Sequence, residues 1–307
     1  MKVIRAASEF HSGSRRVCVA IGMFDGVHLG HQQVIRQTLE DARQHDGLAL
    51  VVTFDRHPNA VIAPESMPLL IQTLPQKLRA IQALGVHATW LIEFDRAFSQ
   101  VTGDAFARSL ARDLGQLHSL CVGSAFTFGH RRSGNVALLK QVGRELGFQV
   151  HGLAAVSLGG RAVSSTRIRE AIQAGDLDLA AQMLGRTYAL AGTVRRGDQL
   201  GRELGFPTAN LEVSGLVLPP RGVYAVRARF GDQPHPAVLN IGLRPTLGDP
   251  HPTLQVEAHL LDFNQDLYSR ELEVAFVARI RDEQRFPSLK ALKVQIGRDV
   301  EAARRLL

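Results

Sequence analysis

Two histidines separated by a leucine and a glycine follow an apolar run near the start of the chain. His28 and His31 lie in GMFDGVHLGHQQVI, residues 22–35, between the apolar residues 17–21 and an amphipathic pattern. Histidines at this spacing fit three kinds of site: a metal centre, a structural loop or a phosphate-binding loop. A metal centre needs at least one further ligand, for which His57 is the candidate.

The phosphate-binding interpretation has the strongest physical support. Gly30 has no β-carbon, so a ligand can approach the backbone closely there. The helix predicted after this loop offers unpaired N–H groups and the positive end of its dipole. The stretch VSSTRIREAI, residues 163–172, either caps a helix or adds a phosphate clamp built from Ser165, Thr166 and Arg169.

A second glycine-rich stretch, RRGDQLGRELGFPTANL, spans residues 195–211. Loops that wrap polyphosphate need such glycines, and the oxygens of Thr208 and Asn210 suit Mg²⁺. The alternative is a glycine-rich hairpin with no ligand. The glycines concerned are Gly197, Gly201 and Gly205.

A carboxylate lies further along, on a predicted strand over 253–263. Alternation places Glu257 on the face shared by Gln255 and His259, opposite a face of apolar side chains. A glutamate on a half-exposed strand is usually only solvated. It becomes a candidate general base if a substrate hydroxyl is placed beside it.

The elements that position these residues follow two different rhythms. In the first half, near-continuously apolar runs alternate with amphipathic ones, which predicts an α/β domain with a Rossmann-like parallel sheet. Ligands of such sheets bind beyond the carboxyl ends of the strands, where His28 lies. The strands are expected over 16–22, 48–54, 88–94, 120–123 and 148–154, and the helices over 31–44, 75–85, 102–115 and 135–146.

After about residue 186 strands become frequent, which predicts an antiparallel β-barrel with a closing helix over 288–307. Residues 165–185 are expected to form two short helices. The domains are therefore expected to span residues 1–185 and 186–307. The strands of the barrel are expected over 190–196, 222–230, 236–242, 254–263 and 271–281.

Composition narrows the class of protein. The net charge of +7 is spread over both halves, and the longest basic clusters are pairs. This distribution favours anionic small molecules over nucleic acid as partners. Two cysteines in apolar runs, no signal peptide and no run long enough to span a membrane predict a cytoplasmic protein without membrane partners.

The quoted motifs carry a family resemblance. GMFDGVHLGHQQVI resembles the signature of bacterial FMN adenylyltransferases, which belong to the HxGH nucleotidyltransferase superfamily, and VSSTRIR resembles their second ATP motif. VGSAFTFGHRRSG, residues 122–134, resembles a third block. Ala125 departs from the usual acidic or amide residue, and Asn135 from the usual aspartate, which puts the flavin or adenine contact there in question.

Five blocks of the second half resemble riboflavin kinases in order, so the whole chain resembles the bifunctional riboflavin kinase/FAD synthetase family. Ser269 stands where a glycine commonly follows the DLY triplet. The blocks are GRELGFPTANL, GVYAV, NIGLRPTLG, VEAHLLDFNQDLY and FVARIRDEQRF.

The resemblance implies two reactions: phosphorylation of riboflavin to FMN in the barrel, and adenylylation of FMN to FAD in the first domain, with ATP as co-substrate of both. It assigns catalysis to Glu257, His28 and His31, and Mg²⁺ to Thr208 and Asn210. The remaining expected contacts are Gly22, Phe24, Asp25, Gly30, Ser165, Thr166, Arg169, Gly197, Gly201 and Gly205 for ATP and its phosphates, and Phe126, Phe128, Asn135 and Arg244 for flavin.

Several alternatives stay open at this stage. Asp25 would fix its loop, contact Mg²⁺, or only form the Asp-Gly turn. Adenylyl transfer to another phosphate acceptor, such as phosphopantetheine, is one rival function. A flavin-binding or RNA-binding module with an inactive catalytic half is another. The oligomeric state is open, with a homo-oligomer as one alternative.

Overall fold

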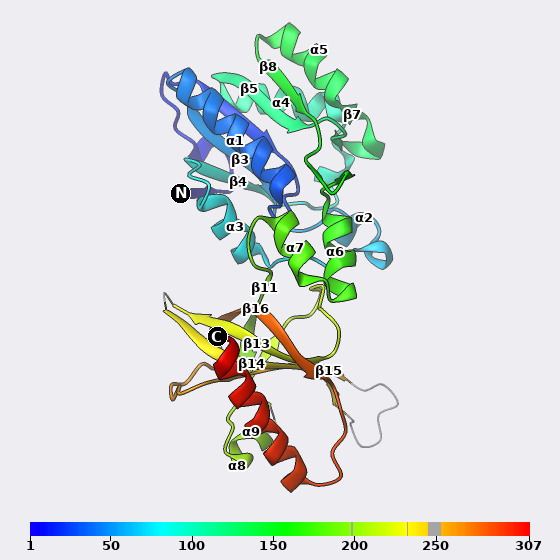
Figure 1. Cartoon of the computed structure of the whole chain (residues 1–307). Helices are drawn as coiled ribbons and strands as arrows, with labels where there is room; N and C mark the ends of the chain where they lie inside the picture. The colour runs from blue at the N-terminus through cyan, green and yellow to red at the C-terminus, as the bar shows by residue number, and fades with distance from the viewer. Residues whose placement is uncertain (198, 232, 245–252) are drawn as a thin grey trace. The chain divides into compact units, whose positions relative to one another are not determined.

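The structure is a computed structural model of the 307-residue chain, and its contacts divide that chain into two compact units (Figure 1). The described residues are 1–197, 199–231, 233–244 and 253–307. The first unit comprises residues 1–69 and 74–165, and the second comprises residues 70–73 and 166–307.

The first unit is built on a six-stranded sheet in which all neighbouring strands are parallel. The strands are β1 (Lys2–Ile4), β2 (Val17–Ile21), β3 (Leu48–Phe54), β4 (Ala88–Ile92), β5 (Leu117–Gly123) and β8 (Gln149–Leu153). Their order is β1-β4-β3-β2-β5-β8. The predicted Rossmann-like parallel sheet is confirmed. Sequence patterning missed β1, because three residues are too few to show a pattern.

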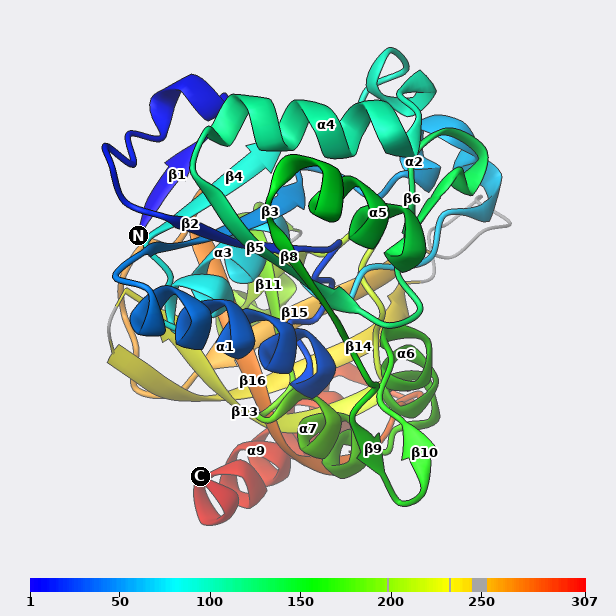
Figure 2. The ribbon, with the colours of Figure 1, turned by 90° about the horizontal axis from the view of Figure 1, so that it is seen from above.

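Helices cover both faces of this sheet (Figure 2). Residues such as Val19 and Leu120 share one core cluster with the apolar residues of α4 and α5. Ala20 and Val51 face the opposite way and pack with α1 and α3. Burial on both faces explains why the strands are nearly continuously apolar. The helices are α1 (Leu29–Gln44), α2 (Asn59–Ile62), α3 (Leu74–Gln82), α4 (Gly103–Leu114) and α5 (Val136–Leu146).

The strand order places two of the predicted site segments at one point of the sheet. From β2 the chain adds β3 and β4 on one side of the sheet and then crosses to add β5 and β8 on the other, so the strand order reverses between β2 and β5. Ligands of open parallel sheets bind at such a reversal, beyond the carboxyl ends of the strands. Residues 22–28 leave β2 there, and residues 124–128 leave β5 beside them.

Two short hairpins extend the connections of the first unit. β6 (Thr127–Phe128) pairs with β7 (Gly134–Asn135) after β5. β9 (Ser157–Leu158) pairs with β10 (Arg161–Ala162) just before the helix that carries Ser165. Neither hairpin was predicted, since two-residue strands give no alternation to detect.

The second unit contains a closed barrel in which all neighbouring strands are antiparallel, as predicted. The strands are β11 (Ala189–Arg195), β12 (Ala209–Glu212), β13 (Gly222–Phe230), β14 (Gln233–Arg244), β15 (Thr253–Leu260) and β16 (Glu271–Asp282). Their order around the barrel is β11-β12-β15-β14-β13-β16. The sequence prediction treated the β12 segment as a loop, and this assignment was wrong.

Helices complete the second unit. The closing helix α9 (Leu289–Leu306) packs Val300 and Ala303 against Val223 and Val238 of the barrel. The two short helices expected over 165–185 are confirmed as α6 (Ser165–Ala174) and α7 (Leu177–Leu184). A five-residue helix, α8 (Leu200–Leu204), lies between β11 and β12.

Residues 70–73 belong to the second unit although they lie far from it in sequence. Leu70 forms an isolated parallel bridge with Leu216. The side chain of Arg186 donates to the amide oxygen of Gln72 at 3.0 Å. Burial lowers the pKa of Arg186, while the charge of Glu273 acts in the opposite direction. This four-residue excursion was not predicted from the sequence.

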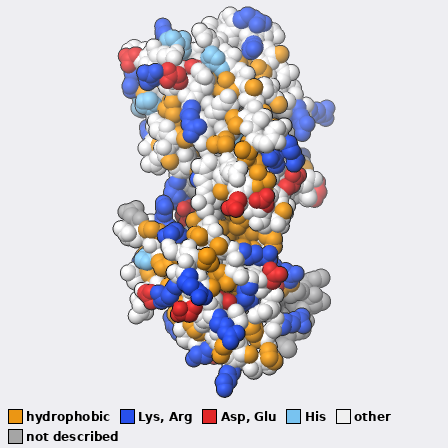
Figure 3. Space-filling model, viewed as in Figure 1, with side chains coloured by type: hydrophobic (Ala, Val, Ile, Leu, Met, Phe, Trp, Pro, Cys, Tyr) orange, Lys and Arg blue, Asp and Glu red, His pale blue; other side chains and the backbone are white. Residues whose placement is uncertain are grey.

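The surface mixes charges of both signs. On the face shown in Figure 3, Lys and Arg side chains are interspersed with Asp and Glu in each unit. Within the described ranges, no helix combines the length and the apolar character that crossing a membrane requires.

Candidate active sites in the two units

The loop after β2 has a strained backbone. Phe24 and Val27 have φ angles of 50° and 38°, a region that side chains with a β-carbon rarely adopt. Phe24 and Val27 are also buried, at 1 % exposure each, so packing holds them in this conformation. Such strain is found where a loop must present particular groups, and this loop leads directly into His28 and α1.

The two histidines meet in the first turn of α1. His28 is the N-cap, and its Nδ1 accepts the backbone N–H of His31 at 3.3 Å. The rings stack with their centroids 3.6 Å apart. Because Nδ1 of His28 is an acceptor, the proton of its neutral ring lies on Nε2.

His31 is held in the neutral state. Burial, followed by the charges of His28 and Lys77, lowers the pKa of His31 well below 6.5. Its Nδ1 is buried and has no hydrogen-bond partner among the described residues. A buried polar atom without a partner is costly, so an incoming ligand atom that bonds Nδ1 would gain free energy.

Gly30 and Ser165 lie in the two predicted phosphate motifs of the N-terminal half. A β-carbon at Gly30 would lie 3.2 Å from the ring of His28, so glycine leaves room for the imidazole as well as for a ligand. The hydroxyl of Ser165 donates to the carbonyl oxygen of Asp25 at 3.0 Å. Thr166 and Arg169 follow Ser165 on α6. The hydrogen bond joins Ser165 to the loop after β2.

The third block forms an aromatic surface after β5. The rings of Phe126 and Phe128 stack with centroids 5.3 Å apart, and Phe106 packs edge-on against Phe128. Asn135 caps α5, because its side-chain oxygen accepts the N–H of Leu138 at 3.0 Å. Aspartate and asparagine cap equally well, so this departure from the family pattern leaves the helix start intact.

A metal centre built on His28 and His31 gains no further ligand from the described residues. Nδ1 of His57 accepts the N–H of Asn59 at 3.1 Å. Within the part of the chain that the structure describes, no group of three His, Cys, Asp or Glu side chains is placed to hold a metal ion.

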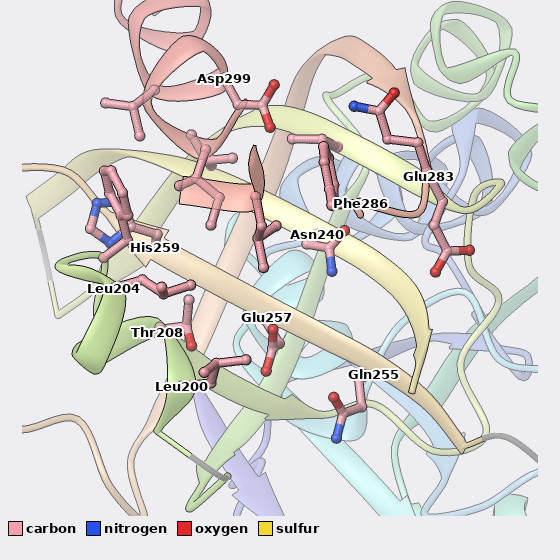
Figure 4. Close-up of a pocket in the computed structure, with 18 of the residues that line it drawn as sticks. Leu200, Leu204, Thr208, Asn240, Gln255, Glu257, His259, Glu283, Phe286 and Asp299 are labelled. Carbon is pink, nitrogen blue, oxygen red and sulfur yellow. The ribbon is translucent and has the colours of Figure 1, made fainter. Parts of the chain in front are cut away.

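A pocket of about 1120 Å³ opens between the barrel and α9 (Figure 4). Glu257 lines it, together with Gln255 and His259 on the same face of β15, as the alternation predicted. Asn240 of β14 is the register partner of Glu257 on one side, and Asn210 of β12 is its partner on the other. Figure 4 shows Glu257 and Asn240 projecting from neighbouring strands into the same space.

The predicted metal-binding pair lies next to this carboxylate. Thr208 lines the pocket, and the carbonyl of Pro207 before it accepts from Nδ1 of His259 at 2.7 Å. A β-carbon at Gly197 would clash with the amide of Asn210. A β-carbon at Gly201 would lie 2.5 Å from the carbonyl of Phe206 and 3.2 Å from the hydroxyl of Thr208. These two glycines therefore make room for the pair.

Gly205 has a different local role. It ends α8 with a φ of 90°, and a β-carbon there would meet no atom within 4 Å. Its left-handed conformation is that of a helix C-terminal glycine. The side chain of Arg244, and residues 245–252 of the NIGLRPTLG block, lie outside the described residues.

The opposite wall of the pocket is fixed by a buried ion pair. Arg281 donates from Nε and Nη2 to the carboxylate of Asp299 on α9, at 2.8 to 3.0 Å. Its guanidinium also lies over the ring of Phe286, 5.6 Å from the centroid. These contacts join β16, the loop after it and α9 around one side of the pocket.

Comparison with known proteins gives the family of each half of the chain. Residues 11–167 match the family model of FAD synthetase, and residues 184–307 match that of riboflavin kinase. The bifunctional riboflavin kinase/FMN adenylyltransferase of Escherichia coli K12 is 39% identical over 99% of this chain and 97% of its own length. The chain belongs to this bifunctional family.

Other relatives support the same assignment. The family members of Haemophilus influenzae and Pseudomonas fluorescens are 36% and 39% identical, over 99% and 100% of this chain and 98% of each entire relative. A crystal structure of a protein named macrolide-efflux protein, from Streptococcus pneumoniae, is 29% identical, with a TM-score of 0.82 and coverage of 98% of both chains. The order of the two reactions along the chain agrees with the sequence prediction.

The neutral His31 of this enzyme predicts a pH-dependent stability. The unfolded chain binds a proton at His31 near pH 6.5, whereas the folded chain does not, so acid favours unfolding. The free energy of unfolding of the first unit is expected to fall below about pH 6.5, by up to about 1.4 kcal/mol per pH unit for this proton. Thermal unfolding from about pH 7.5 to 5.5 should show a shallower slope in His31→Gln; equal slopes would contradict the prediction.

The structure adds residues that sequence reasoning did not assign. Asn240 lies opposite Glu257 on the neighbouring strand. Its position on the polar face of a predicted strand could have identified it from the sequence. Lys77 is buried on α3, at 7 % exposure. The sequence could have indicated it, because Lys77 lies one helical turn before the buried Ile81, where an apolar residue is expected.

Proposed function

We propose that riboflavin is phosphorylated in the barrel pocket, where Glu257 acts as the base. We propose that FMN is adenylylated at the end of β2, where His28 and His31 contact the ATP phosphates. The observation that supports the first assignment is the row formed by Asn210, Glu257 and Asn240 across three paired strands. It puts a carboxylate between two amides, and Glu257 and Asn240 line a pocket large enough for a flavin and a nucleotide phosphate.

In the proposed kinase reaction, the 5′-hydroxyl of riboflavin attacks the γ-phosphorus of ATP. A new O–P bond forms, the bond to the β-phosphate oxygen breaks, and ADP leaves. The carboxylate of Glu257 accepts the hydroxyl proton. The amide of Asn240, opposite Glu257 on the neighbouring strand, would orient the ribityl chain or the carboxylate.

Mg²⁺ fits the residues beside Glu257. Thr208 and Asn210 supply neutral oxygen donors, and Mg²⁺ commonly takes one or two protein ligands and completes its shell with water and substrate phosphates. Bound Mg²⁺ would neutralise charge on the transferring phosphate. Thr208 and Asn210 are held by the close packing of Gly201 and Gly197, which a side chain would disturb.

Gly197→Ala is therefore expected to raise the Mg²⁺ concentration needed for riboflavin phosphorylation by about tenfold, as for the loss of about 1.4 kcal/mol of binding. Its new methyl displaces the amide of Asn210. Gly297→Ala on α9 is the matched control, because a β-carbon there meets nothing within 4 Å. An unchanged Mg²⁺ titration in Gly197→Ala would exclude Asn210 as a ligand.

In the proposed adenylyl transfer, an oxygen of the FMN phosphate attacks the α-phosphorus of ATP, and pyrophosphate leaves. The FMN phosphate is largely ionised at neutral pH, since the second pKa of such esters is about 6. No general base is required. The protein must bring two anions together and stabilise the leaving charge.

The loop after β2 suits that task. Nε2–H of His28 and the ring of His31 would contact the ATP phosphates, within the loop shaped by Gly22, Phe24, Asp25 and Gly30. Ser165 would hold the pyrophosphate end, and the sequence motif adds Thr166 and Arg169 to this proposal. Phe126 and Phe128 would stack on the flavin, and Asn135 would act through the start of α5. Arg244 would contact phosphate or flavin in the kinase site.

The remaining proposals concern organisation. We place the boundary between the functional domains after residue 185, where Gly185 ends α7 in a left-handed conformation. The proposed location is the cytoplasm, where ATP is present and where the two buried cysteines remain reduced. Proposed partners are the small molecules ATP, riboflavin, FMN and FAD, and a homo-oligomer remains a proposal.

One experiment tests the function as a whole. The protein is incubated with riboflavin, ATP and Mg²⁺, and flavins are separated by chromatography over time. FMN should form first and FAD later. A second incubation with FMN in place of riboflavin should give FAD and pyrophosphate directly. Absence of FAD from both would refute the proposal for the first unit, and absence of FMN from the first would refute it for the second.

A further inference from the structure

A buried lysine lies beneath the loop that carries the two histidines. Lys77 of α3 is 7 % exposed, which is rare for this residue type. Its Nζ donates to the carbonyl of Phe54 at 2.7 Å, and to the carbonyl of Met23 and the hydroxyl of Thr53 at 3.4 Å each. Its three N–H bonds thus have three oxygen partners.

These partners belong to two neighbouring strand ends of the sheet. Thr53 and Phe54 end β3, and Met23 follows β2 in the strained loop. The hydroxyl of Thr53 also donates to the carbonyl of Met23 at 3.2 Å. Met23 is therefore tied to the end of β3 by two side chains.

Phe24 links Met23 to the histidines. Phe24 follows Met23 with a φ of 50°, and its ring packs edge-on against His31, with centroids 5.2 Å apart. Movement of the Met23 carbonyl would therefore shift Phe24 and the imidazole that rests on it. Positions of this kind matter because an error of about 1 Å can cost a reaction about 10²-fold.

The charge of Lys77 also lies close to the first turn of α1. Burial lowers the pKa of Lys77 to about 8, while the charges of Asp25 and Asp55 act to raise it. The same ammonium is one of the causes that keep His31 neutral. An ammonium is expensive to bury, and an apolar side chain of similar length would fill the space without that cost. A role in the reaction explains why a cation is there.

We propose that Lys77 is a positioning residue for adenylyl transfer: its ammonium holds the His28–His31 loop against the end of β3 and places a buried positive charge under the phosphate site. The proposal rests on the assignment of FMN adenylylation to the first unit. It goes beyond that assignment, because Lys77 lies outside the loop and helix-start motifs that define the site.

Lys77→Met in the full chain tests the proposal. The kcat of FAD formation from FMN is expected to fall about 100-fold, with the KM values for FMN and ATP changed by less than about threefold, because the loop contacts that bind substrate remain while their alignment is lost. Riboflavin phosphorylation by the same molecules is the internal control and should be unchanged. A kcat within about threefold of wild type would overturn the proposal.

A pH profile separates a charge role from simple packing. In the wild type, FAD formation should decline above about pH 8 as Lys77 loses its proton. The charged and titratable groups that interact with it are Asp25 and Asp55, which act to raise its pKa, and His31, whose own pKa lies well below 6.5. The decline should be absent from the residual activity of Lys77→Met. An identical alkaline limb in both would refute the charge role.

Thr53→Val tests the proposal even if Lys77→Met does not fold, and the double variant adds a second test if it does. Thr53→Val preserves shape but removes the hydroxyl between Lys77 and Met23, and should lower kcat about fivefold to tenfold; in the double variant the two losses should not add. Asp41→Asn alters another buried ionisable group, near the far end of α1, and should change stability without changing kcat. Wild-type rates in Thr53→Val, or additive losses, would contradict the proposal.

The failures are distinguishable. If the wild-type protein makes no FAD from FMN, the proposed function of the first unit is wrong. If the wild type makes FAD and Lys77→Met makes it equally well, only the role of Lys77 is wrong.

Discussion

Replacing Glu257 by glutamine is expected to lower riboflavin phosphorylation by about 10²–10⁴-fold, the contribution of a well-placed general base. The change keeps the size of the side chain and removes the proton acceptor. Asn240 and Asn210, its register partners, can still pack against the amide. FAD formation from supplied FMN should be unaffected, because Glu257 lies in the barrel pocket and the His28–His31 site is in the first unit.

The measurement is the rate of FMN formation from riboflavin and the rate of FAD formation from FMN, with the same preparation. Glu212→Gln is the matched control: it changes a carboxylate on the adjacent strand β12 that is absent from the described lining of the pocket. If Glu257→Gln lost both activities while remaining folded, the assignment of one reaction to each unit would be wrong.

Replacing His28 by asparagine should abolish FAD formation and let FMN accumulate from riboflavin. Asparagine is among the best N-caps, so it can still accept the N–H of His31. It lacks the Nε2–H donor, and removal of one such donor to a developing charge typically costs about 10²–10³-fold in rate. His31→Ala should also abolish FAD formation, since it removes the ring that stacks on His28.

His28→Ala separates capping from chemistry. It should lose FAD formation to the same extent as His28→Asn and, in addition, about 1 kcal/mol of stability through the missing cap. Thermal unfolding and flavin chromatography measure the two effects independently. Normal FAD formation by His28→Asn would show that the histidine serves only as a cap.

The general architecture could be predicted from the sequence because it depends on patterns spread over many residues. The strands β2, β3 and β4 are nearly continuously apolar, and the spacing of the strands by amphipathic helices predicts parallel order. The contact of Glu257 with the pocket was also predictable, because alternation along β15 sorts its side chains onto two faces.

Features that depend on contacts distant in sequence could not be predicted. β12 contains only ANLE, and Pro207 just before it is typical of a turn, so its pairing with β11 and β15 appears only in three dimensions. The role of Lys77 depends on oxygens from two other strand ends. The assignments of His28, Ser165, Thr208 and the other site residues stay predictions, although the structure supplies contacts that favour several of them.

The excursion of residues 70–73 has a consequence for biosynthesis. The ribosome releases Leu70 long before Leu216, its bridge partner, has been made. The second unit is therefore completed by returning to a segment that was synthesised with the first. A fragment that starts at residue 184 would contain every residue of the barrel but would lack the Leu70 bridge and the amide of Gln72 that accepts from Arg186. Cutting the chain to separate the two activities would therefore remove contacts that residues 70–73, made early in synthesis, supply to the kinase half.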